Sequence, residues 1–211
     1  MSKIKNSTIQ KYFKLSVKDL YENDLYLLDS SHELHEQAIS HRLAVYLEKY
    51  FSHLKYYKDN GLSVDCEYNK NGEDCKRIYG ICYNCNEHNC FIKKDQRQHN
   101  DIYLPLSGDN DDKAVRPDII IHHRGDNYPT NILVIEVKKV SNPSAQQKRD
   151  DKMKLSAFTC PKSDDDKPCY HYRLGFYLEY QQTSAKVAIF ENGKERSELI
   201  FEVDTHTWRT A

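Results

Sequence analysis

The sequence predicts a single α/β domain, and three kinds of segment support this prediction. Residues 118–122 and 132–138 are short apolar runs rich in Ile and Val, with the length and composition of strands. An apolar stripe at helical spacing runs through residues 31–54. Large side chains alternate strictly through residues 170–180, which predicts a further strand. A chain of 211 residues is long enough for these elements to enclose a sizeable core.

The composition narrows the possible partners and compartments. The net charge is −1, so any surface for nucleic acid must be local. Mean hydropathy is −0.84 and no run approaches the ~20 apolar residues of a membrane span, so we expect no membrane partner. The N-terminus lacks the apolar core of a signal peptide. Seven cysteines without such a signal indicate thiols or metal ligands in a reducing cytoplasm rather than disulfides.

The first 18 residues contain five lysines and no acidic residue. We expect a solvated, flexible tail here, because like charges without acidic partners are typical of such tails. An arm that contacts DNA is the alternative interpretation of the same lysines.

Residues 31–54 form the clearest predicted helix. Ser30 or Ser31 can cap its start, and its apolar residues recur on one broad face. Glu36 lies three residues before Ile39, so its side chain points along that face. An acidic residue at this position lies either at the half-solvated end of the buried stripe or in a site.

Residues 62–68 alternate well enough for a strand after this helix. Asp65 and Glu67 share its more polar face. They fit a solvated outer surface as well as they fit an acidic site, and the sequence does not separate the two interpretations.

Residues 71–114 have the character of an inserted, cysteine-rich subdomain. Cys82 and Cys85 form a C-x2-C pair, which brings two thiolates onto one cation. Cys75 and Cys90 can complete a tetrahedral site, so we predict a structural zinc ion with these four cysteines as ligands. His88 and Cys66 are the substitutes for the fourth ligand. Free thiols, or another thiolate-bound metal such as an iron–sulfur cluster, are the alternatives.

The two apolar runs predict a β-hairpin at the centre of the sheet. Both faces of the second run begin apolar, as in a central strand, yet Glu136 and Lys138 end one face. The pairing leaves Asp118 opposite Ile135 or Glu136, and one register places both carboxylates on one face. Two acids and a lysine are costly to desolvate there unless a divalent cation compensates. An ordinary hairpin with solvated charges at its frayed end is the alternative.

The C-terminal part predicts one more helix and further strands. Residues 144–158 follow a breaker at Asn142-Pro143 and have only a modest apolar face. In the strand at 170–180, we expect one aromatic core face, made of Tyr170, Tyr172, Leu174, Phe176, Leu178 and Tyr180. A hairpin around Asn192-Gly193 closes the chain.

The ordered set of Pro117-Asp118, a hairpin and Glu136-x-Lys138 resembles the core motif of the PD-(D/E)XK, or restriction-endonuclease-like, nuclease superfamily. The resemblance covers roughly residues 33–180, with the cysteines as an insertion, and the whole chain resembles bacterial members of that superfamily. It implies a core of helix, Asp strand, Glu-x-Lys strand, helix and strand. In that core a mixed central sheet is flanked by helices.

The resemblance also implies a function. We expect a nuclease that hydrolyses phosphodiester bonds with Mg²⁺ or Mn²⁺, and nucleic acid, DNA first, as its partner. Asp118 and Glu136 would hold the metal, Glu36 would add an acid, with Glu33 second, and Lys138 would position water or steady the developing charge. Two lysines of the second helix are candidate phosphate contacts: Lys148 and Lys152. The alternative is a non-catalytic nucleic-acid-binding or scaffold protein with structural zinc, and a homodimer is left open.

Overall fold

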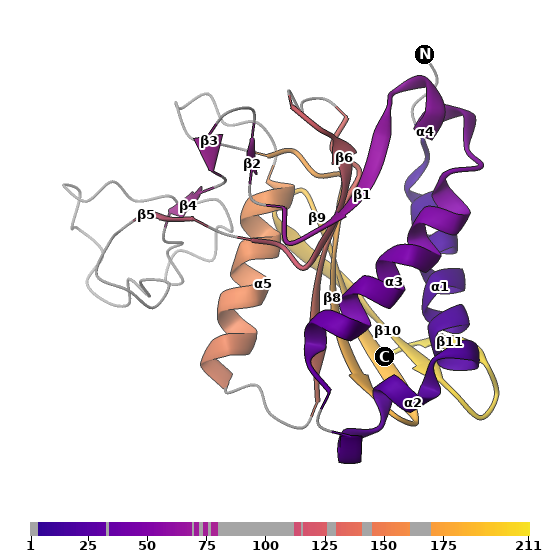
Figure 1. The fold of residues 1–211 in the computed structure, drawn as a ribbon. Coiled ribbons are helices and arrows are strands. Elements are labelled where there is room, and N and C mark those ends of the chain that lie inside the picture. The colour runs from indigo at the N-terminus through magenta and orange to yellow at the C-terminus, as the bar shows by residue number, and fades with distance from the viewer. Residues whose placement is uncertain are drawn as a thin grey trace.

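A computed structural model describes residues 4–32, 34–68, 70–71, 74–75, 77–79, 112–114, 116–125, 130–140, 145–160 and 170–211. Its main feature is a seven-stranded mixed sheet flanked by helices, which confirms the predicted α/β class (Figure 1). In spatial order the strands are β1 (Leu62–Cys66), β6 (Ile119–His123), β7 (Leu133–Lys139), β8 (Leu174–Gln181), β9 (Ser184–Glu191), β10 (Lys194–Glu202) and β11 (Thr207–Thr210). Only β7 and β8 pair in parallel.

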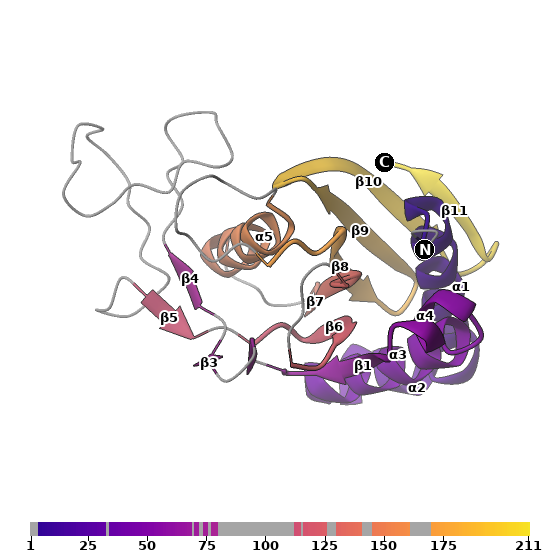
Figure 2. The same ribbon diagram turned by 90° about the horizontal axis from the view of Figure 1, so that it is seen from above.

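Helices cover both faces of this sheet, which curves strongly (Figure 2). One face carries α1 (Asn6–Asn23) and α3 (Glu36–Phe51). The opposite face carries α5 (Ala145–Thr159), which connects the parallel strands β7 and β8. The remaining short elements are α2 (Leu25–Leu28), a 3-10 turn (Ser30–His32), α4 (Lys55–Asp59), β2 (Lys70–Asn71), β3 (Asp74–Cys75), β4 (Arg77–Tyr79) and β5 (Asp112–Ala114). Within the described ranges no helix is both long and apolar enough to span a bilayer.

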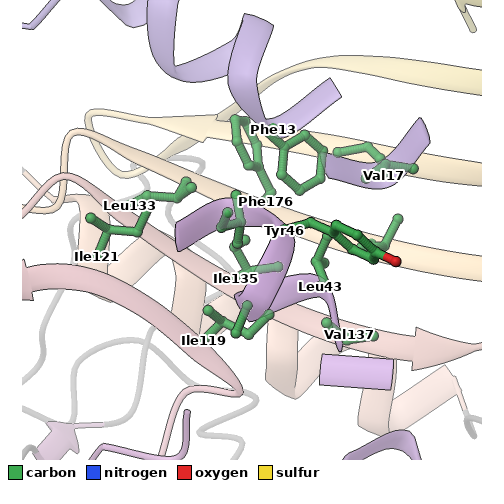
Figure 3. Packing of buried hydrophobic residues seen from close by; sticks show 14 of the residues in the cluster. Phe13, Val17, Leu43, Tyr46, Ile119, Ile121, Leu133, Ile135, Val137 and Phe176 are labelled. Atoms are coloured by element: carbon green, nitrogen blue, oxygen red, sulfur yellow. The ribbon is translucent and has the colours of Figure 1, made fainter. Parts of the chain in front are cut away.

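The central strand β7 is buried on both faces, as its apolar start predicts. Leu133, Ile135 and Val137 point toward α1 and α3, where they join the larger core. Figure 3 shows them packed with residues of both helices. Val134 points the other way, into a smaller core beneath α5 that also contains Phe158. A polar side chain on the α5 face of β7 is therefore enclosed by the helix.

The expectation of a flexible N-terminal tail is wrong, because this segment forms most of α1. Ile9, Phe13, Val17 and Leu20 recur every three or four residues and are at most 1% exposed. The Phe13 ring lies 4.2 Å from that of Phe176 on β8. The lysines of α1 occupy the remaining faces of the helix, so a basic segment can still be an integral part of the fold.

The start of the predicted helix at residue 31 is also wrong. α3 begins at Glu36, and neither Ser30 nor Ser31 caps it. The carboxylate of Asp29 instead accepts hydrogen bonds from the backbone N–H and the hydroxyl of Ser31, both at 2.8 Å. These bonds stabilise a separate local turn, which competes with helix formation.

The single aromatic face predicted for residues 170–180 divides between two cores. Leu174 and Phe176 face α1, whereas Tyr170 and Tyr172 pack beneath α5. His171 has a left-handed φ of 52°, which breaks the alternation before β8 begins. The hairpin at residues 192–193 is confirmed, and both turn residues have positive φ, as a tight hairpin requires. β11 was not predicted.

Candidate functional site

The pairing of β6 with β7 decides the position of the two predicted metal ligands. Ile119 lies opposite Ile135 and Ile121 opposite Leu133. Continuing this register by one residue places Asp118 opposite Glu136. Of the two registers that the sequence allows, the structure has the one in which both carboxylates lie on one face. That face is the one covered by α5.

Asp118 lies at the start of β6 and makes a hydrogen bond across the hairpin. Its Oδ2 accepts a bond of 2.7 Å from the backbone N–H of Val137. Burial raises the pKa of Asp118 to about 6, and the hydrogen bond from Val137 offsets only part of that increase. The carboxyl group is therefore poised between its two protonation states near neutral pH.

Glu136 is more deeply enclosed. Its exposed fraction is 1%, and its Oε1 has no hydrogen-bond partner among the described residues. Burial, and then the neighbouring charge of Asp118, raise the pKa of Glu136 well above the ordinary value. A buried carboxylate oxygen without a partner is costly, so this atom is the clearest sign of an unsatisfied site.

Lys138 lies two residues further along the same face and has acidic neighbours from both sides of the sheet. Its Nζ is 3.1 Å from Glu36 Oε2 and 3.7 Å from Asp151 Oδ2. Burial alone would lower the pKa of Lys138, but the charges of Asp151, Asp118 and Glu36 outweigh burial and raise it. The ammonium group therefore stays charged at neutral pH.

Glu36 reaches this site from the first turn of α3. One carboxylate oxygen contacts the Lys138 ammonium, and the other accepts a 2.9 Å hydrogen bond from the backbone N–H of Lys139. Glu36 therefore fixes the end of β7 and orients its lysine. Glu33, the second candidate on this segment, lies outside the described residues.

Two residues of α5, whose role was not predicted from the sequence, complete the site. Asp151 is 5% exposed, and Lys154 Nζ lies 2.6 Å from Asp151 Oδ1 and 3.7 Å from Glu136 Oε2. The signal was present, because Asp151 precedes the buried Leu155 and Phe158 by four and seven residues. We refer to Asp118, Glu136, Asp151, Lys138 and Lys154 as the acidic cluster.

Other candidates lie away from the acidic cluster. Lys148 forms an ion pair with Glu179 on β8, and Lys152 Nζ lies 3.1 Å from Glu195 Oε2 on β10. Both ammonium groups thus have carboxylate partners. Glu67 accepts a 2.6 Å hydrogen bond from the Gln37 side chain. Asp65 pairs with His122 of β6 and with Arg124, which follows β6.

The predicted zinc site lies mostly outside the described residues. This holds for Cys82, Cys85, Cys90 and His88. Cys75 belongs to β3, but its side chain is also outside the described set. Cys66 ends β1 and is exposed, with its Sγ 4.0 Å from the Ser40 carbonyl.

The acidic cluster has the donor atoms for a hard divalent cation. In the described part of the chain, no three His, Cys, Asp or Glu side chains are already gathered as a metal-binding group. Asp118 and Glu136 nevertheless offer two facing carboxylates, and Glu136 Oε1 lacks a partner. Oxygen ligands of this kind suit Mg²⁺, which keeps several waters and needs only one or two carboxylates.

Comparison of the chain with protein-family models, with curated proteins and with solved structures finds no match in any of the three.

Proposed function

We propose that this protein is a metal-dependent nuclease that hydrolyses phosphodiester bonds in nucleic acid, with DNA as its substrate class. The observation that carries the proposal is the convergence of Asp118, Glu136 and Lys138 at one end of the α5-covered face. Two facing buried carboxylates repel each other and lose hydration, which destabilises a fold unless a cation joins them. A binding or scaffold protein has no evident need for such an arrangement.

The order of the elements gives independent support. Along the chain, α3 is followed by β6 with Asp118, β7 with Glu136 and Lys138, α5 and then β8. This is the order of the restriction-endonuclease-like core, and we propose that the chain has that core, with a zinc-binding insertion at residues 71–114. Glu36 and Lys154 are contributed by the two helices of the core.

Each residue of the cluster has a definite role in this proposal. Asp118 and Glu136 would hold Mg²⁺ or Mn²⁺, which, when bound, polarises the scissile phosphate and lowers the pKa of a bound water. Lys138 remains protonated, so it donates hydrogen bonds and positive charge to the attacking water and the phosphate oxygens rather than accepting a proton. Glu36 and Asp151 hold the Lys138 side chain in place.

The test is cleavage of a panel of single- and double-stranded DNA and RNA with Mg²⁺, with Mn²⁺ and with chelator. Wild type should cleave only with metal, and Asp118→Asn and Lys138→Met should each lose about a hundredfold or more in rate. Lys152→Met is the matched control on α5, since its ammonium pairs with Glu195, and it should cleave normally. Wild-type rates in Asp118→Asn, or binding without cleavage of every substrate, would overturn the proposal.

A further inference from the structure

The lysines of the N-terminal segment line a groove that the acidic cluster does not include. The groove has a volume of about 430 Å³ and lies between α1 and the β11 region. Both views show α1 and β11 side by side (Figures 1 and 2). Its walls carry Lys11, Lys14 and Lys18 from α1, with His206 and Trp208 from the C-terminal turn and strand.

The charged side chains that line this groove are all basic. None of its lining residues is acidic. The three lysines are spaced by three and four residues, so they share one face of α1. The buried residues of α1 hold the opposite face against the sheet, which fixes this lysine row toward solvent. In a chain with a net charge of −1, such a row is a local concentration of positive charge.

The lysines have few partners that would neutralise them. Glu22 lies 3.4 Å from both Lys18 Nζ and His206 Nδ1, but the three side chains are 38–44% exposed, so these pairs are weak. Lys14 Nζ lies over the Trp208 ring, 5.5 Å from its centroid. Among the ion pairs of the described residues, none includes Lys11 or Lys14.

Trp208 makes the groove rigid on its other wall. Its ring packs 5.1 Å from Phe201 and 6.4 Å from Phe13, so the core fixes the indole while its outer part remains accessible. A fixed wall keeps the lysine row in place, which lowers the entropy cost of binding an anion. Trp208 is also the only tryptophan of the chain. Its fluorescence therefore reports directly on what enters the groove.

We propose that this groove binds the phosphodiester backbone of nucleic acid and is a docking surface separate from the acidic cluster. The proposal rests on the proposed function in one respect, namely that the substrate is nucleic acid. Lysines spaced along one helix face can contact successive phosphates without reading bases. From Lys11 to Lys18 the row extends about 10 Å along the axis.

The groove lies on the α1 side of the sheet, whereas the acidic cluster lies on the α5-covered face. α1 leads into α2, and the chain then enters α3 at Glu36, which contacts Lys138. No residue lines both the groove and the acidic cluster, so the groove is a separate docking surface. A lipid surface fits less well, because the exposed large apolar residues of the described part, Leu25, Tyr26, Val45 and Val140, do not line the groove.

The experiment measures binding without catalysis. Full-length protein in chelator is titrated with a 30-residue DNA strand and with the corresponding duplex, and both Trp208 fluorescence and oligonucleotide anisotropy are followed. The triple variant Lys11→Gln, Lys14→Gln, Lys18→Gln should bind at least about tenfold more weakly at 0.1 M salt. Its slope of log K against log salt should be shallower by about two to three.

The matched control removes the same charge elsewhere. Lys55, Lys58 and Lys194 are exposed and do not line the groove, so their triple Gln variant should bind within about twofold of wild type. Equal weakening in both triple variants would overturn the proposal, as would a Trp208 signal that does not respond to nucleic acid. A signal with anionic vesicles but not with DNA would assign the groove to lipid and also overturn it.

This design separates the two proposals. If the groove variant loses binding while wild type cleaves no substrate, the groove stands and the nuclease proposal fails. If the groove variant binds normally while Asp118→Asn abolishes cleavage, the nuclease proposal stands and the groove proposal fails. Thermal unfolding of each variant confirms that the fold is retained, since the exchanged side chains lie at the surface.

Discussion

Two clusters of charge lie on the α5-covered face of the sheet, and only one of them is neutralised by its own side chains. At one end Asp65 is bound on both oxygens: Oδ2 lies 2.9 Å from His122 Nε2 and 2.9 Å from Arg124 Nε, and Oδ1 accepts from Arg124 Nη2. Four residues before His122 on the same chain segment, Asp118 belongs to the acidic cluster, where three carboxylates share two ammonium groups.

The pKa values of the two aspartates are consequently shifted in opposite directions. Burial would raise the pKa of Asp65, but hydrogen bonds from Arg124 and His122 outweigh it and lower the pKa. Burial raises the pKa of Asp118 to about 6. The Asp65 cluster therefore stabilises the fold as it stands, whereas the acidic cluster destabilises the metal-free protein. Of the two clusters, only the acidic cluster destabilises the fold, which indicates that it serves a function.

The largest expected effect comes from the same substitution at both positions. At pH 7 in chelator, Asp118→Asn should raise the free energy of unfolding by about 1–3 kcal/mol, because the amide oxygen still accepts from Val137 while the charge is removed. Asp65→Asn should lower it by about 1–3 kcal/mol, because His122 and Arg124 lose their anionic partner. Urea denaturation measures both. A shift of the same sign in the two variants would contradict the comparison.

The pH dependence of stability should also differ between the clusters. The pKa of Asp118 is 3.8 in its ordinary state and about 6 in the fold, so the folded protein binds this proton more tightly. Its contribution is complete below about pH 4 and is lost as pH rises through about 6, by roughly 3 kcal/mol. The Asp65 contribution has the opposite sign and is lost as pH falls.

Urea denaturation from pH 4 to 7 in chelator tests this directly. The stability difference between wild type and Asp118→Asn should change across that range, with wild type losing relative stability as pH rises. The difference between wild type and Asp65→Asn should stay constant across that range and shrink only below about pH 4, because the pKa of Asp65 is lowered from 3.8. A pH-independent difference for Asp118→Asn would show that its carboxyl group is already ionised in the fold at low pH.

The sequence was sufficient to predict the residues of the acidic cluster that lie on strands. The period of two along residues 132–138 places Glu136 and Lys138 on one face, and it follows from local geometry alone. The position of Asp118 depended on hairpin register, which the intervening loop left open by one residue. Glu36 was found because its charged side chain points along the apolar face of an otherwise clear helix.

The other features of the fold and of the acidic cluster depend on tertiary packing, which leaves only a weak signal in the local sequence. Asp151 and Lys154 lie on a helix whose apolar face is narrow, so they resembled ordinary solvated charges. α1 was missed because the five lysines of residues 1–18, three of them in α1, dominated the composition, while the buried residues of α1 lie at every third or fourth position. Between Tyr172 and Leu174 the large side chains change from the core beneath α5 to the core beneath α1, and no residue preference signals this change or the left-handed φ of His171 just before it.

Mg²⁺ and Mn²⁺ should stabilise the protein through the acidic cluster. At a Mg²⁺ or Mn²⁺ concentration a hundredfold above the dissociation constant, the gain should be about 2.7 kcal/mol. For a chain of this length that corresponds to roughly 5–10 °C in Tm. Asp118→Asn should lose this shift, whereas Asp65→Asn should retain it. Differential scanning fluorimetry measures all three, and an equal shift in Asp118→Asn would place the cation elsewhere.

The smallest expected effect distinguishes two neighbouring lysines of α5, Lys154 and Lys152. Lys154 Nζ lies 3.7 Å from Glu136 Oε2, so its ammonium partly neutralises the carboxylates and repels an incoming cation. Burial would lower the pKa of Lys154, but Glu136 and Asp151 outweigh it and raise the pKa, which keeps this charge in place. Lys154→Met should therefore bind Mn²⁺ about tenfold more tightly, or 1.4 kcal/mol, by calorimetry.

The matched variant Lys152→Met removes a charge two residues away that pairs with the partly exposed Glu195. Since exposed pairs contribute little, its metal affinity and stability should both stay near the wild-type values. Without metal, Lys154→Met should instead be less stable than wild type, because Glu136 and Asp151 lose their counter-ion. Tighter metal binding combined with a less stable metal-free protein is a pattern that general loosening of α5 does not produce. Weaker metal binding in Lys154→Met would show that the ammonium supports the cation site rather than competing with it.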